Sequence, residues 1–127
     1  MDVPSNLKYT KTDEWVRVEG DEIVIGITDY AQGELGDIVY VELPEPGRYL
    51  QKEQAFGAVD SNKTTSELYT PVEGEVAAAN GNLVSAMELI NTDPYGEGWI
   101  VRIRATDLSP LDDLMSADEY AAYRSDH

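Results

Sequence analysis

The chain has 127 residues, and its 9 Lys and Arg residues against 25 Asp and Glu residues give a formal net charge of −16. This length allows one modest core, so we expect a single domain over residues 1–127. The charge argues against nucleic acid and anionic membrane surfaces as partners, because both would repel it.

The first half of the chain reads as short strands around one helix. Strands are expected over residues 15–18 and 22–27, with Gly20 and Asp21 forming the turn between them. Thr28 or Asp29 can cap a short helix that runs to Leu35 and ends at Gly36. A further strand is expected over 37–43, before the prolines at 44 and 46.

The second half continues this pattern. Two strand-like runs flank Lys63, followed by a strand over 75–79, a turn over 80–82 and a strand over 99–104 with Arg102 and Arg104 on its solvent face. A helical turn is expected within 107–115. Ser116 and Glu119 form a capping box that opens a terminal helix over 117–124. The whole series predicts an antiparallel barrel or sandwich with helices at its edges.

The chain almost lacks the histidine and cysteine side chains that usually carry nucleophilic catalysis and bind zinc. There is no cysteine, and the single histidine is the last residue, His127. The interior therefore offers neither a histidine or cysteine for nucleophilic catalysis nor the ligands that zinc prefers. No P-loop, dinucleotide fingerprint or EF-hand spacing is present, although calcium binding by other acidic residues stays open. Catalysis by a histidine- or cysteine-dependent nucleophile is therefore excluded, and the many carboxylate pairs are interpreted as solvated surface.

Sequence features that would direct the protein to a membrane or an organelle are missing. Residues 1–12 have neither the apolar core of a signal peptide nor the pattern of a transit peptide, and no apolar run approaches the length of a membrane span. We therefore expect a cytoplasmic protein. Because acidic residues occur along the whole chain, we favour the cytoplasm of a halophilic prokaryote over an ordinary acidic protein.

Lys63 is expected on the turn of a hairpin, between two segments in which apolar residues roughly alternate with polar ones. The chain has three other lysines (Lys8, Lys11 and Lys52), and small polar residues surround Lys63. A lysine on such a turn can aid solubility and block edge pairing, or it can be a site of covalent attachment. The residues alone leave these two interpretations about even.

Five segments resemble, in order and spacing, the glycine cleavage system H proteins, which carry lipoate. They are LKYTKTDEWV at 7–16, GITDYAQ at 26–32, LGDIVYVELP at 35–44, GAVDSNKTTSELYTPVEGEV at 57–76 and LINTDPYGEGWI at 89–100. The likeness covers essentially the whole chain, including the tail over 111–123. Because several separate motifs agree in register, chance similarity is a poor explanation.

The resemblance implies a mainly β fold, a flattened barrel-like sandwich of two antiparallel sheets of the lipoyl- and biotinyl-carrier type, with a hybrid motif and short peripheral helices that include a C-terminal one. It implies that Lys63 is the lipoyl attachment site and that Asp60, Ser61 and Glu67 surround it for recognition. It also implies that Glu14 lines a cavity for the loaded arm, with Thr12 and Glu67 at neighbouring positions.

The resemblance implies that the chain itself is a non-catalytic carrier and that its partners are enzymes. They are glycine decarboxylase (the P protein, with pyridoxal phosphate), an aminomethyltransferase (the T protein, with tetrahydrofolate), dihydrolipoamide dehydrogenase (the L protein, with FAD) and lipoylating enzymes. A lipoyl-lysine arm reaches on the order of 14 Å, enough to enter another protein's cleft. The chain would shuttle the aminomethyl group of glycine from the decarboxylase to the aminomethyltransferase, and Glu14 would hold its cationic amine.

Three residues depart from the family pattern, and other functions remain open. Asp13 and Tyr30 stand where histidines are usual, and Asn62 replaces an apolar residue before the lysine. One alternative is an H-like relay that donates lipoyl groups to other enzymes, and another is the lipoyl domain of a 2-oxoacid dehydrogenase. A biotin carrier usually has methionines on both sides of its lysine, unlike Asn62 and Thr64 here. An interaction module would leave Lys63 unacylated.

Overall fold

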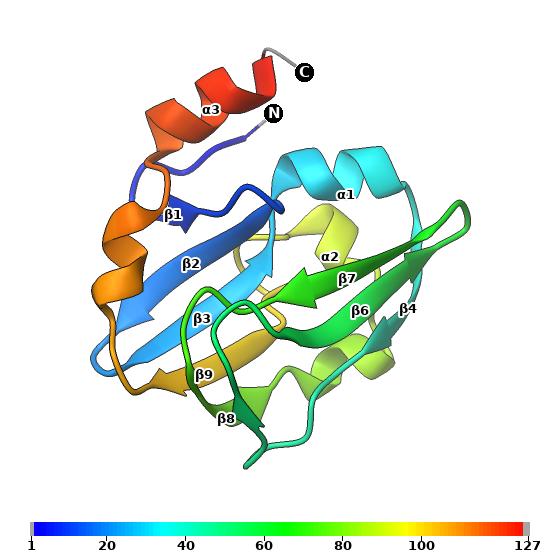
Figure 1. The fold of residues 1–127 in the computed structure, drawn as a ribbon. Helices are drawn as coiled ribbons and strands as arrows, with labels where there is room; N and C mark the ends of the chain where they lie inside the picture. Colours follow the sequence, from blue (N-terminus) through cyan, green and yellow to red (C-terminus); the bar gives the residue numbers. More distant parts are fainter. Residues whose placement is uncertain (1, 126–127) are drawn as a thin grey trace.

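A computed structural model describes residues 2–125, and it contains two antiparallel sheets (Figure 1). The six-stranded sheet has the order β1 (Lys8–Tyr9), β2 (Glu14–Glu19), β3 (Glu22–Ile27), β9 (Val101–Ala105), β8 (Gly74–Ala79) and β5 (Tyr49–Leu50). The three-stranded sheet has the order β4 (Ile38–Glu42), β6 (Ala55–Ser61) and β7 (Thr65–Tyr69). The mainly β sandwich expected from the sequence is confirmed.

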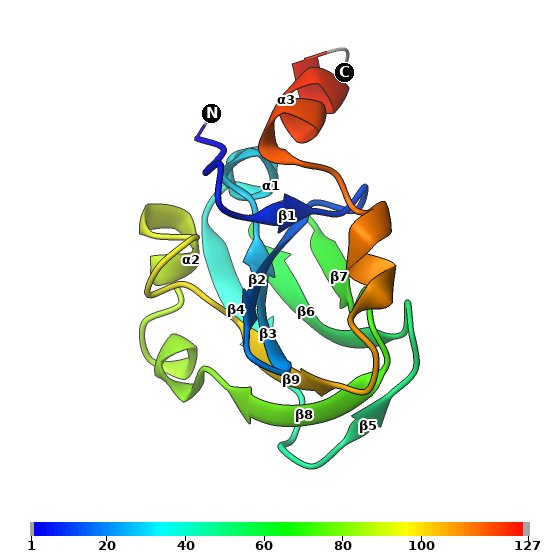
Figure 2. The ribbon, with the colours of Figure 1, turned by 90° about the vertical axis from the view of Figure 1, so that its left-hand side faces the viewer.

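Five short helices of the described chain lie around the sheets (Figure 2). They are α1 (Asp29–Leu35), η1 (Gly81–Val84), α2 (Leu89–Thr92), η2 (Ser109–Asp113) and α3 (Ala117–Ser125), of which the η segments are 3₁₀ helices. Among the residues that the structure describes, no helix is long and apolar enough to cross a membrane. His127 lies outside the described residues.

Local capping explains where the predicted helices begin and end. The Thr28 hydroxyl accepts the backbone N–H of Ala31 at the start of α1, and Gly36 ends this helix with a φ of 79°. At the start of α3, the N–H of Ser116 donates to the Glu119 carboxylate while the N–H of Glu119 donates to the Ser116 hydroxyl. Both helices are therefore confirmed.

A few elements differ from the sequence-based expectation. Trp99 precedes β9 instead of belonging to it, because its N–H donates to Gly96 in a turn. A 3₁₀ helix, η1, replaces the simple turn expected over 80–82, and the Asn80 side chain caps it by accepting the N–H of Asn82. The strands β1 and β5 and the helix α2 were not expected, since two to four residues are too few to show a hydrophobic period.

The main core lies between the two sheets. Ile23 and Ile25 of β3 and Ile103 of β9 join Phe56 and Val59 of β6 in one buried cluster. Ile23 and Ile103 face each other in the register of the six-stranded sheet, so their side chains share one face. Packing of two apolar faces is what makes short strands of this kind stable. The core packs the β6–β7 hairpin against the six-stranded sheet.

A second buried cluster joins α3 to the six-stranded sheet. The rings of Tyr9 and Tyr120 stack with centroids 4.8 Å apart, next to the buried Trp15. Just before α3, Met115 exchanges two backbone hydrogen bonds with Tyr9, each 2.9 Å long. The C-terminal part of the described chain is therefore fixed beside the turn between β1 and β2.

Candidate functional site

Lys63 lies at the tip of the hairpin formed by β6 and β7, as expected, and its side chain is exposed. Asp60 pairs with Thr65 across the base of the turn. The Ser61 hydroxyl oxygen accepts the N–H groups of Lys63 at 3.0 Å and of Thr64 at 3.1 Å. A single serine thus orders the backbone that presents the lysine.

The lysine side chain lies against the end of α1. The hairpin tip extends past the C-terminal end of that helix (Figure 1). Lys63 Cε is 3.1 Å, and Nζ 3.5 Å, from the place where a Cβ atom on Gly36 would stand. Because Gly36 has no Cβ atom, the lysine side chain has room to pass there.

The two acids expected around Lys63 have different surroundings. Asp60 is half-buried on the middle strand β6, where it pairs with Tyr40 as well as Thr65. Glu67 is exposed on β7, and its carboxylate accepts a hydrogen bond from the Tyr69 phenol at 3.1 Å. Glu67 is not among the residues that line the cavity described next, although Tyr69 is. Glu67 is linked to that cavity through Tyr69.

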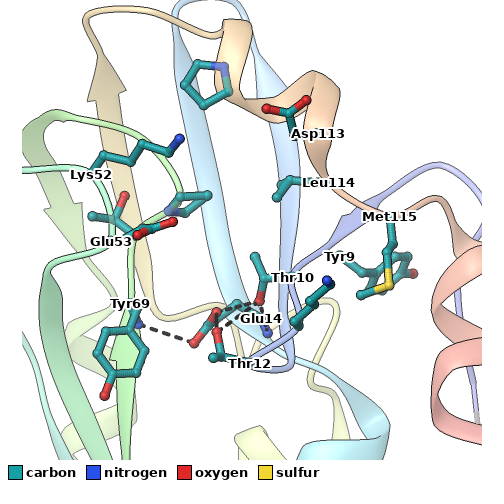
Figure 3. A pocket seen from close by; sticks show the side chains of 14 residues that line it. Tyr9, Thr10, Thr12, Glu14, Lys52, Glu53, Tyr69, Asp113, Leu114 and Met115 are labelled. Atoms are coloured by element: carbon teal, nitrogen blue, oxygen red, sulfur yellow. Dashed lines mark hydrogen bonds between the residues drawn. The ribbon is translucent and has the colours of Figure 1, made fainter.

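A cavity of about 520 Å³ opens between the β1–β2 turn and the far end of β7. Lys52 and Glu53 lie on one side of it, and Asp113, Leu114 and Met115 lie on the other (Figure 3). Glu14 lines this cavity and is only 1% exposed. Thr12 also lines it, so the structure brings together these two of the predicted residues.

The Glu14 carboxylate has three hydrogen-bond donors (Figure 3). Its Oε1 accepts the hydroxyl groups of Thr10 at 2.6 Å and Thr12 at 2.5 Å. Its Oε2 accepts the backbone N–H of Tyr69 at 3.2 Å, from the other sheet. The two sheets therefore meet at this carboxylate.

Burial raises the pKa of Glu14 from 4.5 to about 7. The hydrogen bonds from Thr10, Thr12 and the Tyr69 N–H act against this rise, and the negative charge of Asp13 adds to it. A carboxyl group with this pKa can gain or lose a proton near neutral pH. A cation delivered to the cavity would favour the ionised form.

The family model for the glycine cleavage H-protein matches residues 7–127. The chain belongs to this family. The H protein of Staphylococcus carnosus is 54% identical over 120 residues, which are 94% of this chain and 95% of the relative. The H protein of Brevibacillus brevis is 52% identical over 122 residues, which are 96% of this chain and 97% of the relative.

Solved structures support the same membership in the glycine cleavage H-protein family. The crystal structure of an H protein from Mycobacterium marinum superposes with a TM-score of 0.89 at 35% sequence identity. The match covers 97% of this chain and 99% of the other. The sandwich, the hairpin with Lys63 and the peripheral helices therefore belong to a fold shared with an experimentally determined H protein.

Two departures from the family pattern meet at one residue of α3. Asp13 accepts hydrogen bonds from Arg124, at 2.8 Å to Nε and 2.5 Å to Nη2, and from the Tyr120 phenol at 2.7 Å. The Arg124 guanidinium also lies over the Tyr30 ring, 4.4 Å from its centroid. Asp13 and Tyr30, the two positions at which the resemblance leads to an expectation of histidine, therefore both contact Arg124.

Part of the environment of Glu14 was not predicted from the sequence. Thr10 was not singled out, although Thr10, Thr12 and Glu14 follow each other at intervals of two residues and could have been grouped. The Tyr69 N–H and the segment of Leu114 and Met115 come from distant parts of the chain, so no local pattern indicated them. Among the described residues, no group of His, Asp and Glu side chains could hold a metal ion.

Proposed function

We propose that this chain is the lipoyl carrier of the glycine cleavage system, that Lys63 bears the lipoyl group, and that the protein takes the aminomethyl group of glycine from the decarboxylase to the aminomethyltransferase. The observation that carries this proposal is the placement of Lys63 at one end of β7 and of the buried Glu14 carboxylate at the other. The chain acts as a carrier, and the catalysis belongs to its partners.

The residues around Lys63 fit an amide-linked lipoyl group. The side chain is exposed on an ordered turn, and Gly36 leaves space beside it. Asp60 and Ser61 flank the lysine, with Glu67 further along β7, as a recognition surface for the lipoylating enzyme. When bound, the lipoyl group supplies a redox-active pair of sulfur atoms that the cysteine-free chain does not contain.

The role of the remaining residues is to receive and shelter the carried amine. The strand from Thr65 to Tyr69 spans roughly 14 Å, comparable to the reach of a lipoyl-lysine arm. At its end, Glu14 offers a buried carboxylate to a primary ammonium group, with Thr12 beside it. The enclosed position limits access of water to that group.

The partners in this proposal are the P, T and L proteins and a lipoylating enzyme. A net charge of −16 suits fast, transient docking to enzymes with basic surfaces, because long-range attraction raises association rates. The same charge suits a salt-rich cytoplasm, where screening limits self-repulsion. We propose that the protein works in such a cytoplasm.

The test is a lysine exchange followed by intact-mass measurement. Lys63→Arg and, as a control, Lys8→Arg would be incubated with a lipoate ligase and then added to the P, T and L proteins. Lys8→Arg is expected to gain the mass of one lipoyl group and to support glycine cleavage, whereas Lys63→Arg is expected to do neither. A Lys63→Arg protein that supports full glycine cleavage would overturn the proposal.

A further inference from the structure

Thr10 contacts both the backbone and the side chain of Glu14. The Thr10 hydroxyl donates to Glu14 Oε1 at 2.6 Å. The Thr10 hydroxyl oxygen also accepts the backbone N–H of Glu14 at 3.0 Å. We propose that Thr10 is the positioning residue of the carrier, which fixes the Glu14 carboxylate so that Oε2 is directed to a cationic amine in the cavity. This inference rests on the proposed function, because it assigns the amine as cargo.

Counting protons shows which oxygen is left for the cargo. A threonine hydroxyl has one proton to donate. Thr10 and Thr12 both donate their hydroxyl proton to Oε1. No proton is then left for a hydrogen bond between the two hydroxyl oxygens, which are 3.3 Å apart. Oε2 has one donor, the Tyr69 N–H, and a carboxylate oxygen can accept two. An ammonium group therefore finds its acceptor at Oε2.

The two threonines are not equivalent. Thr10 and Glu14 are also joined by a 3.0 Å backbone bond from the Thr10 N–H to the Glu14 carbonyl, and the Thr10 carbonyl accepts the N–H of Asp13 at 3.2 Å. Thr12 is exposed and reaches Glu14 through its hydroxyl alone. Thr10 thus links the main chain and the side chain of Glu14, whereas Thr12 supplies a second donor (Figure 3).

Other charged groups around the cavity affect how Glu14 titrates. Asp13 precedes Glu14 in the chain and is paired with Arg124. The charged residues that line the cavity from neighbouring elements are Lys11, Lys52, Glu53 and Asp113. These residues are unchanged in the variants below, so a difference in titration between variants reports on the threonine hydroxyl.

The first experiment uses the unmodified protein and does not depend on lipoate. The Glu14 carboxyl carbon is followed by NMR against pH in wild type, Thr10→Val, Thr10→Ser and Thr12→Val. We expect Thr10→Val to raise the pH midpoint of the Glu14 titration. We also expect it to shift the Tyr69 amide signal, because the carboxylate turns away from the Tyr69 N–H. Thr10→Ser should restore the wild-type midpoint and the wild-type amide signal. Thr12→Val should raise the midpoint while the Tyr69 signal stays in place. An unchanged titration and amide signal in Thr10→Val would overturn the proposal.

The second experiment measures how long the lipoylated protein retains the aminomethyl group. Thr10→Val should release ammonia and formaldehyde about tenfold faster at neutral pH, the effect of losing about one charge-assisted hydrogen bond, and Thr10→Ser should match wild type. Equal release by Thr10→Val and wild type would refute the inference. If Thr10→Val does not fold, Thr10→Ala replaces it in both experiments. Failure of the proposed function itself would appear separately, as glycine cleavage by Lys63→Arg.

Discussion

The Asp13 carboxylate and the Arg124 guanidinium form a two-point ion pair that joins the start of β2 to α3. Both side chains are largely shielded, with 18% of the Asp13 side chain and 13% of the Arg124 side chain exposed. Asp13 also has a φ of 74°, a left-handed conformation that an aspartate tolerates better than most residues. The ion pair therefore fixes Asp13, the residue next to Glu14, to α3, the helix that directly follows the cavity-lining residues 113–115.

Replacing Arg124 with methionine should lower the free energy of unfolding by about 3 kcal/mol. The substitution keeps most of the apolar volume but leaves the shielded Asp13 carboxylate without its cation. Chemical denaturation monitored by tryptophan fluorescence measures the change. Arg104→Met is the matched control, because the Arg104 side chain is 54% exposed and its pair with Glu22 is expected to contribute less than about 1 kcal/mol. Equal losses in the two variants would contradict a special role for Asp13.

Glu14 should make the unmodified protein less stable as pH rises. Its folded-state pKa of about 7 lies above the ordinary 4.5, so folding favours the protonated form. That contribution is fully present below pH 4.5 and is lost as pH rises through about 7. Glutamine is neutral at every pH. The unfolding free energy of Glu14→Gln, relative to that of wild type, should therefore rise by about 3 kcal/mol between pH 4.5 and pH 7.

The measurement is denaturant unfolding of both proteins across this pH range. The comparison is made as a difference, because the high net charge affects the two proteins almost equally. Asp107→Asn is a control on an exposed carboxylate, whose pKa is lowered by hydrogen bonds from Ser109. Asp107 is ionised in both the folded and the unfolded protein between pH 4.5 and pH 7, so the difference in unfolding free energy between Asp107→Asn and wild type should stay nearly constant over this range. A constant difference between Glu14→Gln and wild type would show that the carboxyl group titrates normally.

Ser61 should control how well the lysine is presented. Ser61→Ala removes the acceptor of the Lys63 and Thr64 N–H groups, so the turn samples more conformations. We expect lipoylation by a purified ligase to slow several-fold, mainly through a higher KM, while the unfolding free energy falls by about 1 kcal/mol. Ser66→Ala, on β7 beyond the turn, is the control. Equal ligase kinetics for the two variants would argue against an ordering role.

Local signals made some parts of this molecule predictable. The caps Thr28 and Ser116 and the turn around Lys63 are short-range features, so the sequence revealed α1, α3 and the β6–β7 hairpin. The bond from Tyr69 to Glu14 joins residues 55 apart, and the Asp13–Arg124 pair joins residues 111 apart. Such contacts arise only when the sheets and α3 pack, so the shape of the Glu14 cavity was beyond prediction from sequence.

Gly36 should be required for efficient modification of Lys63. A methyl group at this position would stand 3.1 Å from Lys63 Cε, and the φ of 79° is unfavourable for alanine. Gly36→Ala should therefore push the end of the lysine side chain aside and strain the end of α1, which should slow lipoylation a few-fold, with a loss of about 1 kcal/mol in unfolding free energy.

Gly33→Ala is the matched control for this prediction. Gly33 lies within α1, the helix that Gly36 ends, and a methyl group there would meet no atom outside the helix backbone within 4 Å. Because alanine is the better helix former, this variant should be more stable by about 1 kcal/mol and should be lipoylated at the wild-type rate. Intact-mass time courses with a lipoate ligase measure both rates, and thermal unfolding measures both stabilities. If Gly36→Ala is modified as fast as Gly33→Ala, the space beside Gly36 is not needed by the lysine.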